Sequence, residues 1–322
     1  MCNINNKQEQ RTICLFDKKI EIRKYGCSKN DNPIKYIKNP SVNLFIQVTN
    51  KCNANCRFCE FHSNCNIDNS NFDLQKLQII LEEIAKNSYH IGKINFTGGE
   101  PTLDLSLFHN VVSITQNTIK EKLSYKPEIT LNTNGVHLLN MLQYEDFLNN
   151  IGLSRHHYDD ERNEKIFQTK SVATNNTIKL FQENTKNKKL LQLRCNLIPN
   201  KIDNYEKIVK YLDKAIELGC CDCGFVTLMP LNEYCKDNQV DFEALIKDSP
   251  NIINVVSWKR YNDMIDNDNV ELCKCSNYIY QNKNGIFCKF YRRHFCHNDL
   301  NAGQLVFDGK FLRFGFGGEI IY

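Results

Sequence analysis

Residues 52–59 read Cys-Asn-Ala-Asn-Cys-Arg-Phe-Cys, a C-x3-C-x2-C run formed by Cys52, Cys56 and Cys59. Three thiolates at this spacing can hold three irons of a [4Fe–4S] cube and leave the fourth iron without a protein ligand. An open iron can bind and reduce a small molecule, whereas a site closed by four cysteines only stores or passes an electron. The alternative is a zinc knuckle, for which His62 or Cys65 could supply the fourth ligand.

Residues 94–101 read Ile-Asn-Phe-Thr-Gly-Gly-Glu-Pro, a β-rich run that ends in two glycines and a carboxylate. Gly98 and Gly99 let backbone approach a ligand closely, and Glu100 can accept from an ammonium group. Taken alone, this run is explained as well by an ordinary strand-to-loop turn. The two motifs together, in this order and separation, resemble the radical S-adenosylmethionine (SAM) superfamily. The matching residues are Cys52, Cys56, Phe58, Cys59 and Gly98-Gly99-Glu100-Pro101.

The resemblance implies an enzyme with a [4Fe–4S] cluster on Cys52, Cys56 and Cys59, and with SAM as its second cofactor. One electron from the reduced cluster then cleaves SAM and releases a 5′-deoxyadenosyl radical, which abstracts hydrogen from a substrate. The electron donor it implies is a flavodoxin or a ferredoxin-type protein. The residues that it places around SAM are Phe58 against the adenine, Gly98, Gly99 and Glu100 at the methionine end, Ser154 and Asn196 at the carboxylate or ribose, and the backbone of Phe225 and Val226 at the adenine.

Composition excludes several other classes of protein. The 322 residues include 41 basic and 37 acidic side chains, a formal net charge of +4, which argues against a dedicated nucleic-acid-binding protein. No run of eighteen apolar residues predicts a membrane span, and residues 1–7 lack the apolar core of a signal peptide. Sixteen cysteines without a secretion signal predict metal centres in a reducing cytoplasm, not a disulfide framework.

Hydrophobic periodicity predicts strands that alternate with helices, and therefore βα units with a parallel sheet. The predicted strands cover residues 43–49, 93–97, 128–131, 151–157, 190–198 and 224–229. The predicted helices cover residues 72–86 (with Ser70 as cap), 105–122, 136–148, 175–184 and 204–218, with a shorter turn at 161–168. Six units predict an α/β fold, a partial (β/α)6 TIM-like barrel, which the resemblance also implies. Both motifs, residues 132–135, Ser154 and Asn196 then fall at the carboxyl ends of strands, where such barrels carry their active groups.

Three regions are predicted along the chain. Residues 1–40 form an N-terminal extension with a small hairpin made by residues 12–16 and 19–23, and residues 41–235 form the barrel. Residues 236–322 lose the βα rhythm and form a C-terminal extension rich in cysteine, aromatics and glycine.

The segment Ser154-Arg-His-His-Tyr-Asp-Asp160 follows the fourth predicted strand. Strand alternation puts Ser154 and His156 on the same face. If that face points into the barrel, His156 can bind substrate or move a proton, which makes it a candidate catalytic residue. The alternative is a hydrogen-bonded interior histidine.

The C-terminal extension holds four further candidate ligands for a second [4Fe–4S] cluster or a zinc ion: Cys273, Cys275, Cys288 and Cys296. Cys235 could replace Cys296 in this set. The arrangement resembles the auxiliary-cluster extensions, of twitch and SPASM type, in a branch of the superfamily that includes the GTP cyclase of molybdenum-cofactor synthesis. The first pair here is C-x-C instead of that cyclase's C-x2-C, and the chain ends in bulky residues instead of a small glycine tail. The shared architecture is expected without the GTP-cyclase activity.

Two substrate classes stay open for a radical SAM enzyme of this kind. A small molecule, such as a nucleotide, sugar or amino-acid derivative, is favoured, because residues 1–40 are too few for the winged-helix domain that a maturase of ribosomally made peptides usually brings. Outside catalysis, the alternative is a zinc or Fe–S binding protein, which Glu100 and the complete barrel pattern argue against. No membrane partner is expected.

Overall fold

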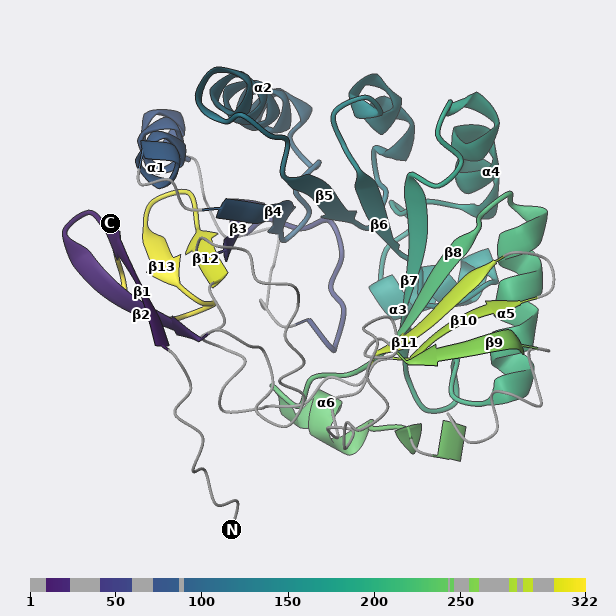
Figure 1. Cartoon of the computed structure of the whole chain (residues 1–322). Helices are drawn as coiled ribbons and strands as arrows, with labels where there is room; N and C mark the ends of the chain where they lie inside the picture. The colour runs from purple at the N-terminus through teal and green to yellow at the C-terminus, as the bar shows by residue number, and fades with distance from the viewer. Residues whose placement is uncertain are drawn as a thin grey trace, which may run out of the picture.

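The computed structural model describes residues 10–23, 41–59, 72–86, 90–242, 244–245, 255–260, 278–282, 286–291 and 304–322 (Figure 1). The strands are β1 (Gln10–Leu15), β2 (Lys18–Arg23), β3 (Ser41–Thr49), β4 (His90–Gly98), β5 (Glu128–Thr133), β6 (Asn150–Ser154), β7 (Leu191–Leu197), β8 (Asp222–Thr227), β9 (Val255–Arg260), β10 (Tyr278–Asn282), β11 (Phe287–Tyr291), β12 (Gln304–Phe307) and β13 (Leu312–Phe314). The helices are α1 (Leu74–Lys86), α2 (Leu105–Lys122), α3 (Asp160–Phe167), α4 (Asn175–Asn184), α5 (Tyr205–Glu217), α6 (Glu233–Asp237) and the 3-10 helix η1 (Leu138–Tyr144).

Strands β3 to β8 lie side by side in chain order and are parallel, which confirms the predicted six-stranded partial barrel. Figure 1 shows this sheet curving, with α1, α2, α4 and α5 on its outer side. Strand β12 adds in parallel to β3, and β11 adds in parallel to β8. The segment predicted as a C-terminal extension therefore continues the barrel sheet at both of its edges.

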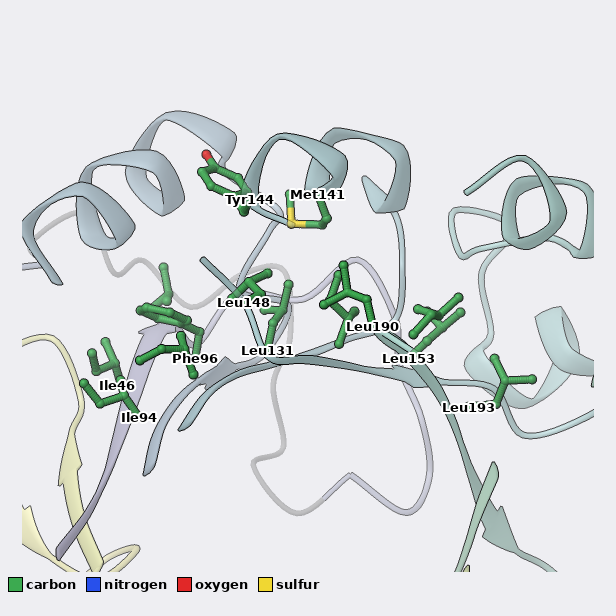
Figure 2. Packing of buried hydrophobic residues seen from close by; sticks show 14 of the residues in the cluster. Ile46, Ile94, Phe96, Leu131, Met141, Tyr144, Leu148, Leu153, Leu190 and Leu193 are labelled. Atoms are coloured by element: carbon green, nitrogen blue, oxygen red, sulfur yellow. The ribbon is translucent and has the colours of Figure 1, made fainter. Parts of the chain in front are cut away.

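The apolar core fills the space between this sheet and its outer helices. Alternate residues of each strand, such as Ile94 and Phe96 in β4 or Leu131 in β5, are fully buried and point toward the helices (Figure 2). Strand alternation places the intervening residues on the inner face, and most of them are polar. They include Asn95, Thr97, Thr130, Asn132, Gln192, Arg194 and Asn196. Because closed barrels fill this face with branched apolar side chains, the polar inner face here is suited to a ligand instead of a packed core.

Two predicted helices differ from the structure. The chain after β5 forms the 3-10 helix η1 instead of an α-helix over 136–148, because Gly135 turns sharply (φ 83°) and starts i→i+3 bonds with Leu138. The turn predicted at 161–168 is a true helix, α3, since Asp159 caps it by accepting from the Arg162 N–H.

The ends of the described chain meet at one edge of the sheet. Strands β1 and β2 form the predicted antiparallel hairpin. Phe16 at its turn stacks on Tyr322, with ring centroids 3.9 Å apart.

The start of α1 differs from the prediction in its cap. The Asp73 carboxylate accepts from the Lys76 N–H at the start of α1 (2.8 Å), while the predicted cap Ser70 lies outside the described residues. In the described part of the chain, none of the helices is long and apolar enough to cross a membrane.

Candidate functional site

The cysteine loop follows β3, and the turn after β4 holds the start of this loop in place. Gly99 N–H donates to Thr49 O (2.7 Å), and Glu100 N–H donates to Lys51 O (2.8 Å). A Cβ on Gly99 would lie 2.6 Å from the Lys51 carbonyl carbon and 2.8 Å from Asn50 O, so no larger residue fits. The sequence explains the glycines by approach to a ligand; the structure shows that they also admit the backbone leading into Cys52.

The three thiols of the loop are half-buried and free of disulfides. Burial, together with smaller effects of the Glu100 and Cys59 charges, raises the pKa of Cys52 to about 11. Burial also raises the pKa of Cys56, and the charges of Cys59 and Cys52 act in the same direction. The thiols are therefore close enough to influence one another, and a metal centre must displace their protons.

The donors around the thiols are of the kind that a [4Fe–4S] cluster takes. Cys52 Sγ faces two N–H groups, from Ala54 N (3.4 Å) and Asn134 Nδ2 (3.9 Å), of the kind that cluster-bound sulfur accepts. Apolar side chains line the loop at Phe167 and Val172. The residues present therefore fit a [4Fe–4S] cluster on Cys52, Cys56 and Cys59.

Glu100 is almost fully buried, at 1% exposure, and its carboxylate is held by protein donors. Oε1 accepts from Thr102 N (3.0 Å), Thr102 Oγ1 (2.6 Å) and Thr133 Oγ1 (2.7 Å). Oε2 accepts from Asn134 N (2.6 Å). Burial raises the pKa of this carboxyl, and these bonds lower it again. The carboxylate thus ties the carboxyl end of β4 to that of β5, while its contact with the SAM ammonium stays a prediction.

His156 is a buried residue at 4% exposure, lying just beyond the end of β6. Its ring stacks on Phe167 (4.8 Å) and meets the Phe58 ring edge-on (4.9 Å). Its Nδ1 accepts from the Asn196 N–H (3.1 Å), so the neutral ring carries its proton on Nε2. Asn163 Oδ1 in turn accepts from the His156 N–H (2.8 Å). The histidine joins the cysteine loop to β7, and its proposed part in catalysis stays a prediction.

The burial of His156 makes a testable prediction about pH. Desolvation first, and then the Arg155 charge, lower the pKa of His156 from 6.5 to about 3. Since the unfolded chain binds the proton more readily, stability should fall as pH drops from 6.5 toward 3, by up to about 1.4 kcal/mol per pH unit. Urea unfolding between about pH 7.5 and 5.5 should show a smaller acid loss for His156→Gln than for the unmodified protein. Equal pH slopes would contradict this, and His109→Gln on the outer helix α2 is the matched control.

The other residues predicted around SAM lie on the strands β6 to β8, toward their carboxyl ends. Ser154 ends β6, is half-buried, and pairs in register with Arg194. Asn196 in β7 is also half-buried and pairs with Val226 in β8. The Phe225 side chain points into the core, fully buried, so only its backbone can reach a ligand on the inner face. Their contacts with SAM remain predictions.

The predicted ligands of a second cluster are only partly described. Cys273, Cys275 and Cys296 lie outside the described residues. Cys288 lies in β11, fully buried in the apolar core and in register with Cys223 of β8. The Cys288 thiol thus packs among apolar core residues. The second cluster remains a prediction.

No sequence motif points to the short helix α6, which contacts the cysteine loop. Asn232 Nδ2 donates to Arg57 O (3.2 Å), and Cys235 Sγ contacts Phe58 O (3.7 Å). The Arg57 guanidinium lies 4.6 Å from the centroid of the Tyr234 ring. Cys235 is one of the candidate ligands for a second cluster, and yet it lies next to the cysteine loop proposed to bind the first cluster. The position of α6 directly after β8 was the only available signal.

Comparison with known proteins agrees with this geometry. The model of the radical SAM superfamily matches residues 46–237, and the chain belongs to this family. Curated relatives include a protein named probable GTP 3′,8-cyclase from Saccharolobus islandicus, 29% identical over 196 residues, which are 60% of this chain and 58% of the relative. Another protein of that name, from Sulfurisphaera tokodaii, is 29% identical over 58% of this chain and 56% of its own length. The chain therefore spans less than two thirds of these relatives.

Solved structures show the same fold at low sequence identity. Streptococcus suis SuiB bound to S-adenosylmethionine has a TM-score of 0.58 at 14% identity, covering 85% of this chain and 60% of that one. A radical SAM methyltransferase from Sphaerobacter thermophilus has a TM-score of 0.53 at 14% identity, covering 83% and 70%. The protein is a radical SAM enzyme, and the cofactors of its family are a [4Fe–4S] cluster and SAM.

Proposed function

We propose that the protein cleaves SAM reductively to a 5′-deoxyadenosyl radical, which abstracts hydrogen from a small polar molecule. The observation that carries this proposal is the meeting of three free thiols with the Gly98–Glu100 turn at the carboxyl ends of β3 and β4. The cluster, when bound, supplies a low-potential electron and an iron open to the methionine end of SAM. The alternative of a metal-binding protein without catalysis leaves this arrangement unexplained.

The chain's own residues prepare the site for that chemistry. Cys52, Cys56 and Cys59 bind the cluster, and the bond from Glu100 N to Lys51 O fixes where their loop begins. The Phe58 ring, next to the last thiol in the chain, meets the His156 ring edge-on, which holds this part of the loop against the end of β6. Such fixed groups lower the reorganisation that reaction would otherwise require.

The inner face of the barrel supports a small polar substrate. Asn132 lies in the middle of the sheet and yet is exposed, which shows that the inner face is open there. Its Nδ2 donates to Asn95 Oδ1 (3.2 Å), and its Oδ1 and the Arg194 side chain both approach Gly152, where a side chain is missing. Amide and guanidinium groups suit hydroxyls, amides or anionic groups of a nucleotide, sugar or amino-acid derivative.

Two finer alternatives follow from the relatives. The relatives named GTP 3′,8-cyclase support a nucleotide among these substrates, but the C-x-C pair departs from that cyclase. The peptide-maturase alternative gains no support from SuiB, because 14% identity speaks for the fold alone. A second cluster, an electron donor of flavodoxin or ferredoxin type, and a cytoplasmic location complete the proposal.

Electron paramagnetic resonance of the reduced, oxygen-free protein tests the open iron. Adding SAM should change the g-values of the cluster signal, because a new ligand alters one iron, and adding 5′-methylthioadenosine, which lacks the amino and carboxylate groups of SAM, serves as control. With dithionite and SAM, 5′-deoxyadenosine should then accumulate. A signal that stays the same with SAM, in protein carrying about four irons per chain, would overturn the proposal.

A further inference from the structure

Asn134, in the turn after β5, joins the cysteine loop to the Glu100 carboxylate. Its backbone N–H donates to Glu100 Oε2 (2.6 Å), and its carbonyl accepts from Ala173 N (3.1 Å). Its side-chain Nδ2 lies 3.9 Å from Cys52 Sγ and 2.8 Å from Asn53 Oδ1. The residue is only 6% exposed, so protein neighbours and not solvent hold it in place.

The hydrogen-bond network fixes which end of the Asn134 amide faces the sulfur. Asn134 Oδ1 accepts from the Val136 N–H (3.1 Å), and a backbone N–H can only donate. The amide NH2 must therefore face Cys52, with one hydrogen for Asn53 Oδ1 and the other for the sulfur.

A donor aimed at a cluster sulfur changes how easily an electron enters. When one electron arrives from an external reductant, no bond forms or breaks, and the sulfurs gain negative charge. An N–H group that points at Cys52 Sγ stabilises that charge and raises the reduction potential. The Glu100 charge acts in the opposite direction, as it does when it raises the pKa of Cys52.

We propose that Asn134 is a positioning residue that raises the reduction potential of the cluster through an N–H···S bond to Cys52. By its backbone bond to Glu100, the same residue sets how far the opposing carboxylate lies from the cluster. The inference rests on the cluster of the proposed function, and it goes beyond that function by assigning control of the potential to one residue.

Redox titration of the loaded protein, followed by electron paramagnetic resonance without SAM, tests this role. Asn134→Ser removes the amide donor and keeps an oxygen for the Val136 N–H, whereas Asn134→Asp replaces the donor by a charge. We expect the midpoint potential to fall by about 59 mV in the first variant, one factor of ten in the reduction equilibrium, and by more in the second. Asn184→Ser, on the outer helix α4 with its Nδ2 donating to Leu180 O (2.8 Å), is the control and should not shift.

The outcomes separate this inference from the proposed function. Iron content and the cluster signal of the unmodified protein report on the cluster itself, and the shift reports on Asn134 alone. Equal potentials in both variants and the control would overturn the inference. If the variants fail to bind iron, hyperfine spectroscopy of the reduced unmodified protein, labelled with 15N in asparagine side chains, decides instead: a weak 15N coupling supports the bond to Cys52, and its absence overturns it.

Discussion

Replacing Cys56 by alanine should abolish the formation of 5′-deoxyadenosine from SAM and dithionite. The variant leaves only Cys52 and Cys59 in the loop, and two thiolates cannot hold a cube whose remaining iron must stay open. We expect a loss of at least a thousandfold in rate, equivalent to about 4 kcal/mol of barrier, together with loss of the iron and the brown colour. Anaerobic reconstitution, iron and sulfide assays and chromatography of the nucleoside products measure both effects.

The matched control for this variant is Cys221→Ala. Cys221 is another half-buried thiol, but it lies before β8, at the opposite end of the sheet from the loop, and contacts Lys188 O (3.5 Å). This control should keep both the iron and the activity. Continued formation of 5′-deoxyadenosine by Cys56→Ala, at the rate of the control, would show that the cluster ligands are assigned wrongly.

The fold could be predicted from the sequence because the alternation of strands and helices repeats over many residues and the segments between them are clearly marked. Each βα unit places alternating apolar residues, such as Leu191, Leu193 and Cys195, on the helix side of a strand. This regularity predicted β3 to β8 and their order. It failed for η1, because the i→i+3 bonds that follow Gly135 depend on a backbone turn that hydrophobic periodicity does not record.

The site was predictable only where chemistry requires a particular residue type. The cysteines stand at fixed spacing, and Gly99 has no substitute beside the Lys51 carbonyl. Residues 132–135 were predicted to lie at the active end of the barrel, but the contact of Asn134 with Cys52 was not, because it depends on a turn after β5 reaching a loop 82 positions earlier in the chain. For the same reason the placement of Cys288 was missed: pairing of β11 with β8 puts that thiol in the core, and spacing alone cannot show strand pairing.

Replacing Gly99 by alanine should remove the cluster without touching any ligand. The new methyl group would meet the Lys51 carbonyl carbon at 2.6 Å and Asn50 O at 2.8 Å, and both are backbone atoms that no side-chain rotation can move. The backbone at the start of the cysteine loop must then shift, which breaks the hydrogen bond from Glu100 N to Lys51 O next to Cys52. We expect a loss of roughly 3 kcal/mol in unfolding free energy and a several-fold loss of bound iron. Urea unfolding and iron assays measure the two effects.

The control for Gly99→Ala must carry the cost of a lost glycine without the clash. Gly317 has a left-handed backbone (φ 69°) and open space for a Cβ, so Gly317→Ala should cost about 1–2 kcal/mol and leave the iron unchanged. Because the strain at Gly317 lies away from the cysteine loop, a loss of iron in Gly99→Ala alone reports on the close approach of the two backbones. If Gly99→Ala binds iron as fully as Gly317→Ala and unfolds no more easily, then contact between the turn after β4 and the start of the cysteine loop does not determine where the cluster sits.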